Sequence, residues 1–238
     1  TAPREVVALG RTGWFAGGLA GAALFAGFAF QTIGLQYTTA SKAGFVTGLY
    51  VVFTPLLAAA VLRRRPSAGV AAGALIAVAG LALLSFSGGA IAVRYGDALV
   101  VACAVAFALQ FVVLGRYAPG LPSGGLAAAQ LWVCGILATA LSLAIEDPVA
   151  PRTAAVWAAL GITAVLASAL AFVVQAVAQR FISPSRTALI LVMETPFAAL
   201  FGFLLLDERF AGWQWAGAAL ILAGMLAAEL APARPDEA

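Results

Sequence analysis

Residues 154–179 read AAVWAALGITAVLASALAFVVQAVAQ, a run of 26 positions without one charged side chain. A bilayer core of about 30 Å is crossed by roughly 20 apolar residues in an α-helix. An open strand in lipid would leave backbone N–H and C=O groups unpaired, so only a helix suits such a run. We therefore expect residues 154–179 to form a transmembrane helix.

Segments of the same kind fill the rest of the chain. Of its 238 residues, 63% are hydrophobic and 10% are charged, and the mean hydropathy is +1.04. A soluble domain carries about 25% charged residues. Clusters of Pro, Gly, Arg and acidic residues bound eight apolar segments, at residues 13–37, 41–62, 68–87, 97–117, 125–145, 154–179, 185–206 and 212–231. The sequence predicts an all-α membrane protein with eight transmembrane helices.

The basic residues predict how these helices are oriented. Alternating the segments from a cytoplasmic N-terminus places nine Lys and Arg residues inside and four outside, as the positive-inside rule expects. Four of the five tryptophans lie near segment ends, where aromatic belts form. We expect a multi-pass protein of the plasma (inner) membrane, with both termini in the cytoplasm. Asp97 is assigned to an outer loop in this arrangement.

The chain resembles itself at an offset of 144 residues. Matching pairs include Gly17 and Gly161, Phe28 and Phe172, Gln31 and Gln175, Phe53 and Phe197, Gly73 and Gly217, and Gly80 and Gly224. The offset contains five segments, and an odd number inverts the second copy in the membrane. Inverted repeats with a site at their interface are typical of secondary transporters. The alternative is a duplicated scaffold without cargo.

The repeat also predicts its own missing part. The second copy begins with the segment at 97, and 97 − 144 = −47, so its counterpart would lie upstream of Thr1. We therefore expect an N-terminally truncated chain with eight of ten helices, in two inverted five-helix repeats. Residues 1–90 are the expected remainder of the first repeat, and residues 91–238 the second.

Three stretches carry a family resemblance. They are ASKAGFVTGLYVVFTPLL at 40–57, METPFAALF at 193–201 and QWAGAALILAG at 214–224. They resemble helices four, nine and ten of EamA-type carriers of the drug/metabolite transporter superfamily. Pro196, which does not directly follow Glu194, and Asp207, in place of the usual Gly, depart from that pattern. The resemblance implies a ten-helix carrier, with family helices three to ten present here, a central cavity, and transport, often export, of small metabolites.

Glu194 and Tyr50 are the first candidate site residues. Glu194 lies near the middle of its segment, where a charged side chain costs roughly 2.5–3.5 kcal/mol to insert. It could contact an amine group of the substrate or carry a coupling proton; alternatively, it is a neutral acid between helices or a cap beside Pro196. Tyr50 occupies the equivalent position, since 50 + 144 = 194. It could line the cavity as the neighbour of Glu194, or it could be ordinary packing.

Three glutamines complete the candidate set. Gln31 and Gln175 are equivalent, and each lies about six residues, or about 9 Å, before the end of its segment. Symmetric gates and plain helix–helix hydrogen bonding both explain such a pair. Gln110 is the strongly polar residue inside its segment and could line the cavity. The hydroxyls of Thr47 and Thr54 are expected to bond their own helix backbone.

Several classes of function lack support in the sequence. There is no His, no phosphate-binding loop and, in the membrane segments, no deep carboxylate besides Glu194. We expect no enzyme, cofactor, metal site or nucleic-acid partner, and Cys103 and Cys134 are expected to be buried without a disulfide. Close spacings of small residues favour packing within the chain over a dimer face; the oligomeric state stays open.

The sequence therefore predicts a secondary transporter, working by alternating access on a small-molecule substrate in the bilayer. Export of an amino acid or related compound is the favoured activity, and proton coupling through Glu194 is a hypothesis. The alternatives are a non-transporting membrane scaffold or accessory subunit and a flippase for lipid-linked substrates.

Overall fold

The structure, a computed structural model, describes residues 2–38, 40–63, 66–85, 95–147, 150–205, 209 and 211–231. These residues form helices and connecting turns, and the described part contains no strand. The helices are α1 (Ala2–Val7), α2 (Gly10–Leu35), α3 (Ala40–Gly48), α4 (Tyr50–Leu62), α5 (Ala68–Ser85), α6 (Tyr95–Tyr117), η1 (Ala118–Gly120), α7 (Ser123–Ile145), α8 (Ala154–Ile162), η2 (Thr163–Leu170), α9 (Ala171–Ala178), α10 (Pro184–Leu191), α11 (Glu194–Leu205) and α12 (Gly212–Leu230).

Each predicted segment contains helix. Five described helices are long and apolar enough to cross a membrane, at Gly10–Leu35, Ala43–Leu62, Tyr95–Gly120, Ser123–Ile145 and Ala154–Ala178. Two shorter apolar helices, Ala68–Leu84 and Gly212–Ala228, follow the same composition. This agrees with an all-α membrane protein, while the count of eight spans remains a prediction.

Two predicted segments are not continuous helices. Segment 41–62 is interrupted at Leu49, and segment 185–206 is interrupted at Val192 and Met193. Segment 154–179 stays helical but widens into the π-helical segment η2. A short helix, α1, also precedes the first segment, and the apolar pattern did not predict it.

The chain forms two compact units, each described here by itself. Unit 1 contains residues 1–25 and 113–181, and unit 2 contains residues 26–112 and 182–238. Unit 2 therefore includes α3–α5, most of α6 and α10–α12. Unit 1 includes α1, the first part of α2, and α7–α9.

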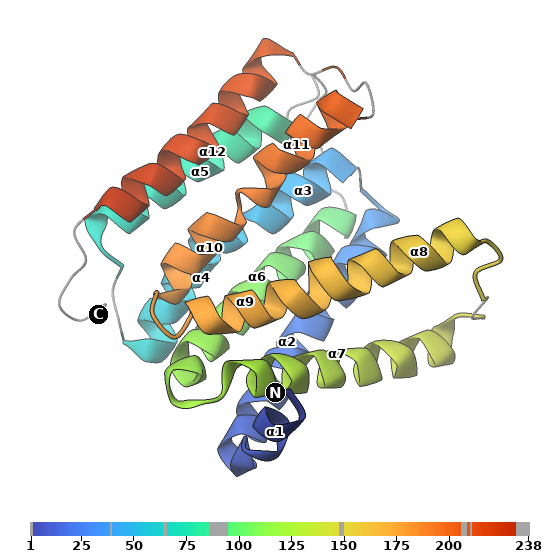
Figure 1. The fold of residues 1–238 in the computed structure, drawn as a ribbon. Helices are drawn as coiled ribbons and strands as arrows, with labels where there is room; N and C mark the ends of the chain where they lie inside the picture. The colour runs from blue at the N-terminus through green and yellow to red at the C-terminus, as the bar shows by residue number, and fades with distance from the viewer. Residues whose placement is uncertain are drawn as a thin grey trace. The chain divides into compact units, whose positions relative to one another are not determined.

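The closest helix pair in unit 2 is α5 with α12, which lie side by side (Figure 1). Glycines make this approach feasible. A Cβ atom at Gly80 would lie 2.6 Å from the Gly217 carbonyl oxygen and 2.8 Å from the Ile221 nitrogen, and one at Gly224 would lie 2.6 Å from the Gly73 oxygen. Small residues of this kind let backbones approach in a membrane, where association depends on packing and hydrogen bonds.

The contacts of this pair have a two-fold pattern. Gly73 meets Gly224, and Gly80 meets Gly217, so the two helices run antiparallel. Adding 144 converts 73 into 217 and 80 into 224, which turns one contact into the other. In an isologous interface the same surface of two equivalent copies forms both sides of the contact. The α5–α12 contact has this property within one chain, with α5 and α12 as the two copies.

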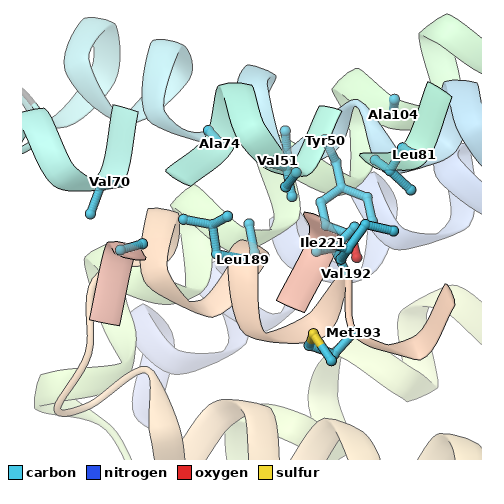
Figure 2. Close-up of a cluster of buried hydrophobic side chains, with 14 of the residues drawn as sticks. Tyr50, Val51, Val70, Ala74, Leu81, Ala104, Leu189, Val192, Met193 and Ile221 are labelled. Carbon is cyan, nitrogen blue, oxygen red and sulfur yellow. The ribbon is translucent and has the colours of Figure 1, made fainter. Parts of the chain in front are cut away.

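The largest apolar cluster of unit 2 surrounds this pair (Figure 2). It combines Val70, Ala74 and Leu81 of α5 with Ile221 of α12. Side chains from α4, α6 and α10 join them. The α5–α12 pair thus provides the surface on which the interrupted helices pack.

Unit 1 is held by an analogous use of glycine. A Cβ at Gly21 of α2 would lie 2.5 Å from the Gln130 carbonyl oxygen of α7, and Gly17 packs against Ala129. At the start of α7, Gly125 donates its backbone N–H to the Glu5 carboxylate at 3.2 Å. This bond attaches α1 to α7.

We predict that Gly80→Ala lowers the stability of the protein by about 1–3 kcal/mol, the usual cost of overpacking. The two nearest atoms that the added methyl group would meet belong to the backbone of α12, which cannot rotate away as a side chain can. The measurement is thermal unfolding in detergent micelles. Gly135→Ala in α7 is the matched control, because nothing lies within 4 Å of its Cβ position. Equal melting temperatures for both variants would contradict the prediction.

Candidate functional site

The two interrupted helices break at equivalent positions. The Leu49 N–H donates to the Val46 carbonyl oxygen at 3.2 Å, and the Met193 N–H donates to the Ile190 oxygen at 3.2 Å. Both bonds span three residues and not four, and they are related by the 144-residue offset. Residues 50 and 194 therefore start α4 and α11, immediately after a tightened turn.

Proline and glycine account for the two breaks. Pro196 has no N–H to give to the Val192 carbonyl, and its ring would collide with that group in a regular helix. The chain responds with a turn at Val192 and Met193. Before the first break stands Gly48, a poor helix former, whose Cβ would lie 2.6 Å from Leu81 of α5.

Tyr50 is buried beside the second break. Its side chain is 7% exposed and packs edge-on against Phe111 of α6, with ring centroids 5.3 Å apart. Figure 2 shows the ring beside Val192 of the α10–α11 turn and Ile221 of α12. Sequence alone left packing and cavity lining open, and the structure shows that Tyr50 packs in the core.

Glu194 directly follows the same turn and is exposed. It occupies the first turn of α11, where the helix dipole favours a negative charge. Within the described residues no hydrogen bond joins the Glu194 and Tyr50 side chains. Equivalent positions in the sequence thus have different surroundings in the structure.

Gln31 makes a hydrogen bond between helices. Its Nε2 donates to Thr47 Oγ1 at 3.2 Å, and the Thr47 hydroxyl lies 3.9 Å from Cys103 Sγ. The group connects α2, α3 and α6 just before the first break. The expectation for Thr54 is confirmed, since its hydroxyl donates to the Tyr50 oxygen at 2.7 Å. The Thr47 hydroxyl, by contrast, accepts a bond from a glutamine on a neighbouring helix.

Gln175 and Gln110 are both buried, with 6% and 1% of their surfaces exposed. Gln175 belongs to unit 1, and its Nε2 donates to Oε1 of Gln179, the residue directly after α9, at 3.3 Å. Gln110 lies on the part of α6 that belongs to unit 2.

Comparison with known proteins gives the family. The EamA-like transporter family matches residues 3–86 and 94–228. The chain belongs to the EamA-like transporter family. A protein of Archaeoglobus fulgidus described as an uncharacterized transporter is 33% identical over 210 residues, covering 88% of this chain and 67% of that protein. A crystal structure described only as that of a protein has the same fold, with a TM-score of 0.79 and 22% identity, covering 91% of this chain and 77% of the other.

Family membership agrees with the resemblance seen in the sequence. This EamA-like chain is an integral membrane protein of a transporter family. Among its described residues, no group of three or more His, Cys, Asp or Glu side chains could hold a metal ion. Cys103 and Cys134 are buried and free, as expected.

Two polar residues have roles that the sequence did not reveal. Arg186 donates from Nη2 to the Ala231 carbonyl oxygen at 3.0 Å, which caps the C-terminal end of α12. Asp97 was wrongly assigned to a loop. It lies in the first turn of α6, where a carboxylate is favoured, and its Oδ1 accepts from Thr38 at 2.5 Å. Both bonds join segments distant in sequence.

We predict that the Gln31–Thr47 bond of this EamA-like transporter stabilises unit 2 by about 0.6 kcal/mol, the mean for hydrogen bonds between membrane helices. A double-mutant cycle with Gln31→Leu and Thr47→Val, read as unfolding free energy, measures the coupling. Thr54→Val serves as the control, because the Thr54 hydroxyl bonds only its own helix. Additive effects of Gln31→Leu and Thr47→Val would exclude this contact.

Proposed function

We propose that the chain is part of a secondary carrier that exports small metabolites, amino acids or related amphipathic compounds, by alternating access. The observation that carries the proposal is the pair of equivalent helix breaks, each followed directly in the sequence by a candidate residue, Tyr50 or Glu194. Interrupted helices at equivalent places in two repeats are the usual position of a transporter binding site. Glu194, the single carboxylate deep in a predicted segment, is the first residue of α11.

The arrangement of helices supports inverted repeats at residues 1–90 and 91–238. Helices α5 and α12 start 144 residues apart, as do α4 and α11. The α5–α12 contact maps onto itself under the same offset and is antiparallel. Equivalent helices that run antiparallel are what an inverted repeat requires. In the proposed orientation, both termini lie in the cytoplasm.

Glu194 is the proposed substrate-binding or coupling residue. It is exposed, although the apolar residues around it would make a charge expensive in lipid. Such a side chain is expected to face a polar cavity, a substrate amine or a proton path. Tyr50 packs beside Val192 in the turn between α10 and α11. Gln110 is proposed to line the polar cavity that Glu194 faces.

Gln31 and Gln175 are proposed as gate residues. In this structure Gln31 donates to Thr47 on a neighbouring helix, and Gln175 donates to Gln179, directly after the end of α9. An inverted repeat places these two glutamines toward opposite membrane faces.

We predict that Glu194→Gln abolishes export, because the amide keeps the size of the side chain but cannot carry the charge or a coupling proton. The measurement is mass-spectrometric profiling of metabolites outside cells that express the complete gene, compared with empty vector. Glu146→Gln is the matched control, since Glu146 is an exposed carboxylate at the end of α7. A compound enriched outside by wild type and by Glu146→Gln, but not by Glu194→Gln, would support the proposal.

Other outcomes favour the alternatives. No enriched compound, with the protein folded in the membrane, would favour uptake or a non-transporting scaffold. Activity on lipid-linked substrates would favour a flippase. If the Glu194→Gln variant still exports the compound and wild-type transport ignores an imposed pH gradient, proton coupling through Glu194 is wrong.

A further inference from the structure

The C-terminal part of α2 packs closely against α6. A Cβ atom at Gly27 would collide with the Phe107 ring, and Phe107 also packs edge-on against Phe28, with ring centroids 5.4 Å apart. Further along α2, a Cβ atom at Gly96 of α6 would lie 2.6 Å from the Gly34 carbonyl oxygen. Residue numbers rise along α2 as they fall along α6, so the two helices are antiparallel, and their glycines bring the backbones together.

Side chains link the two helix ends. Thr38, which follows the end of α2, donates its hydroxyl to Asp97 Oδ1 at 2.5 Å, and Asp97 is buried. Next to this bond, the Tyr37 and Tyr95 rings pack edge-on with centroids 5.5 Å apart. Hydrogen bonds to a carboxylate are roughly twice as strong as those between neutral groups, and burial keeps competing water away from this one. The ends of α2 and α6 are therefore joined by a polar and an aromatic contact.

We call the contacts between residues 27–38 and residues 95–107 the α2–α6 seam. All of them lie within unit 2. On the α6 side, the helix from Gly96 to Phe107 is continuous and rises about 16 Å at 1.5 Å per residue, which is about half of the roughly 30 Å apolar thickness of a bilayer. A passage between the two helices to the middle of the membrane would have to separate close-packed backbones over this whole length. Breaking the contacts at one end would not open it.

The seam joins the two proposed repeats, because α2 belongs to residues 1–90 and α6 belongs to residues 91–238. Its polar contact is not a product of the duplication. Thr38 corresponds to Ile182, since 38 + 144 = 182, and Tyr37 corresponds to Phe181. Neither Ile182 nor Phe181 has a hydroxyl group. The second copy thus cannot form the same hydrogen bond, which makes this bond a specific feature of the end where α2 meets α6.

We propose that α2 and α6 move as one body during transport, and that the substrate does not pass between them. This inference rests on the proposed transport function. Thr38 and Asp97 are positioning residues, which contact each other and hold the helix ends together. Alternating access then opens a path along other helices. The interrupted pairs α3–α4 and α10–α11 are suited to this movement, because hinges lie at the ends of helical elements.

Cross-linking the seam tests whether it opens. In a complete protein whose Cys103 and Cys134 are changed to alanine, Tyr37 and Tyr95 are replaced by cysteines and joined with a short bifunctional thiol reagent that dithiothreitol releases. Both tyrosines are exposed, so the replacements leave the core intact. The measurement is export of the compound that wild type enriches outside cells, before cross-linking, after it, and after dithiothreitol. The Tyr37→Cys and Tyr95→Cys single variants are the controls for the reagent itself.

We expect the cross-linked protein to export within about twofold of its rate before cross-linking, because locking a contact that never opens adds no barrier to transport. A larger loss that dithiothreitol reverses, and that the single variants do not show, would overturn the proposal. A wild-type protein that exports nothing would count against the proposed function alone, and a second readout then decides on the seam.

This second readout is a distance measurement on the purified complete protein, which needs no transport. Spin labels on the same two cysteines are expected to give one narrow distance distribution by pulsed electron paramagnetic resonance, and two populations would overturn the proposal. Thr38→Val removes the donor but keeps the shape of the side chain, and should broaden the distribution toward longer distances. Thr32→Val, at an exposed position of α2, is the matched control and should not. An unchanged distribution in Thr38→Val would contradict the role given to the Thr38–Asp97 bond.

Discussion

The packing of α5 against α12 is the contact on which unit 2 depends. Apolar helices gain little from the hydrophobic effect in lipid, so they associate only where their surfaces fit closely. Glycines 73, 80, 217 and 224 bring the two backbones into contact. The buried cluster around them also includes residues of α4, α6 and α10. Without this crossing, the interrupted helices would lack a firm surface to pack on.

The crossing also explains how the candidate site is positioned. A helix that breaks within a membrane must satisfy its freed backbone groups inside the protein. Here the turns before Tyr50 and Glu194 tighten into hydrogen bonds that span three residues and not four, and the surrounding side chains belong to helices held by α5 and α12. Tyr50, at the start of α4, is covered by Phe111 and the buried cluster. Glu194, at the start of α11, is exposed. The two copies of this motif thus place Tyr50 in the core and leave Glu194 exposed for its proposed role.

Sequence patterns predicted the helical architecture, the family and the approximate helix ends, because apolar length and breaker residues act locally. They indicated the break at Val192 and Met193 only as a kink beside Pro196 in one reading of Glu194, because the apolar side chains around it make the segment look like one continuous span. The Gln31–Thr47 and Arg186–Ala231 bonds could not be predicted either. Each joins residues distant in sequence, and which polar groups meet depends on how the helices are rotated. The burial of Tyr50 against the exposure of Glu194 has the same origin, since equivalent residues face different neighbours.

We propose that the two halves are inverted copies in the membrane, and side-specific labelling tests this proposal most directly. Tyr37 and Phe181 are equivalent positions, since 37 + 144 = 181, and both side chains are exposed just after a helix. Each is replaced by cysteine in a complete protein whose Cys103 and Cys134 are changed to alanine, and intact cells are treated with a membrane-impermeant maleimide. The account predicts that Tyr37→Cys is labelled in intact cells and that Phe181→Cys is labelled only after the membrane is permeabilised. Labelling of both positions from the same side would contradict it.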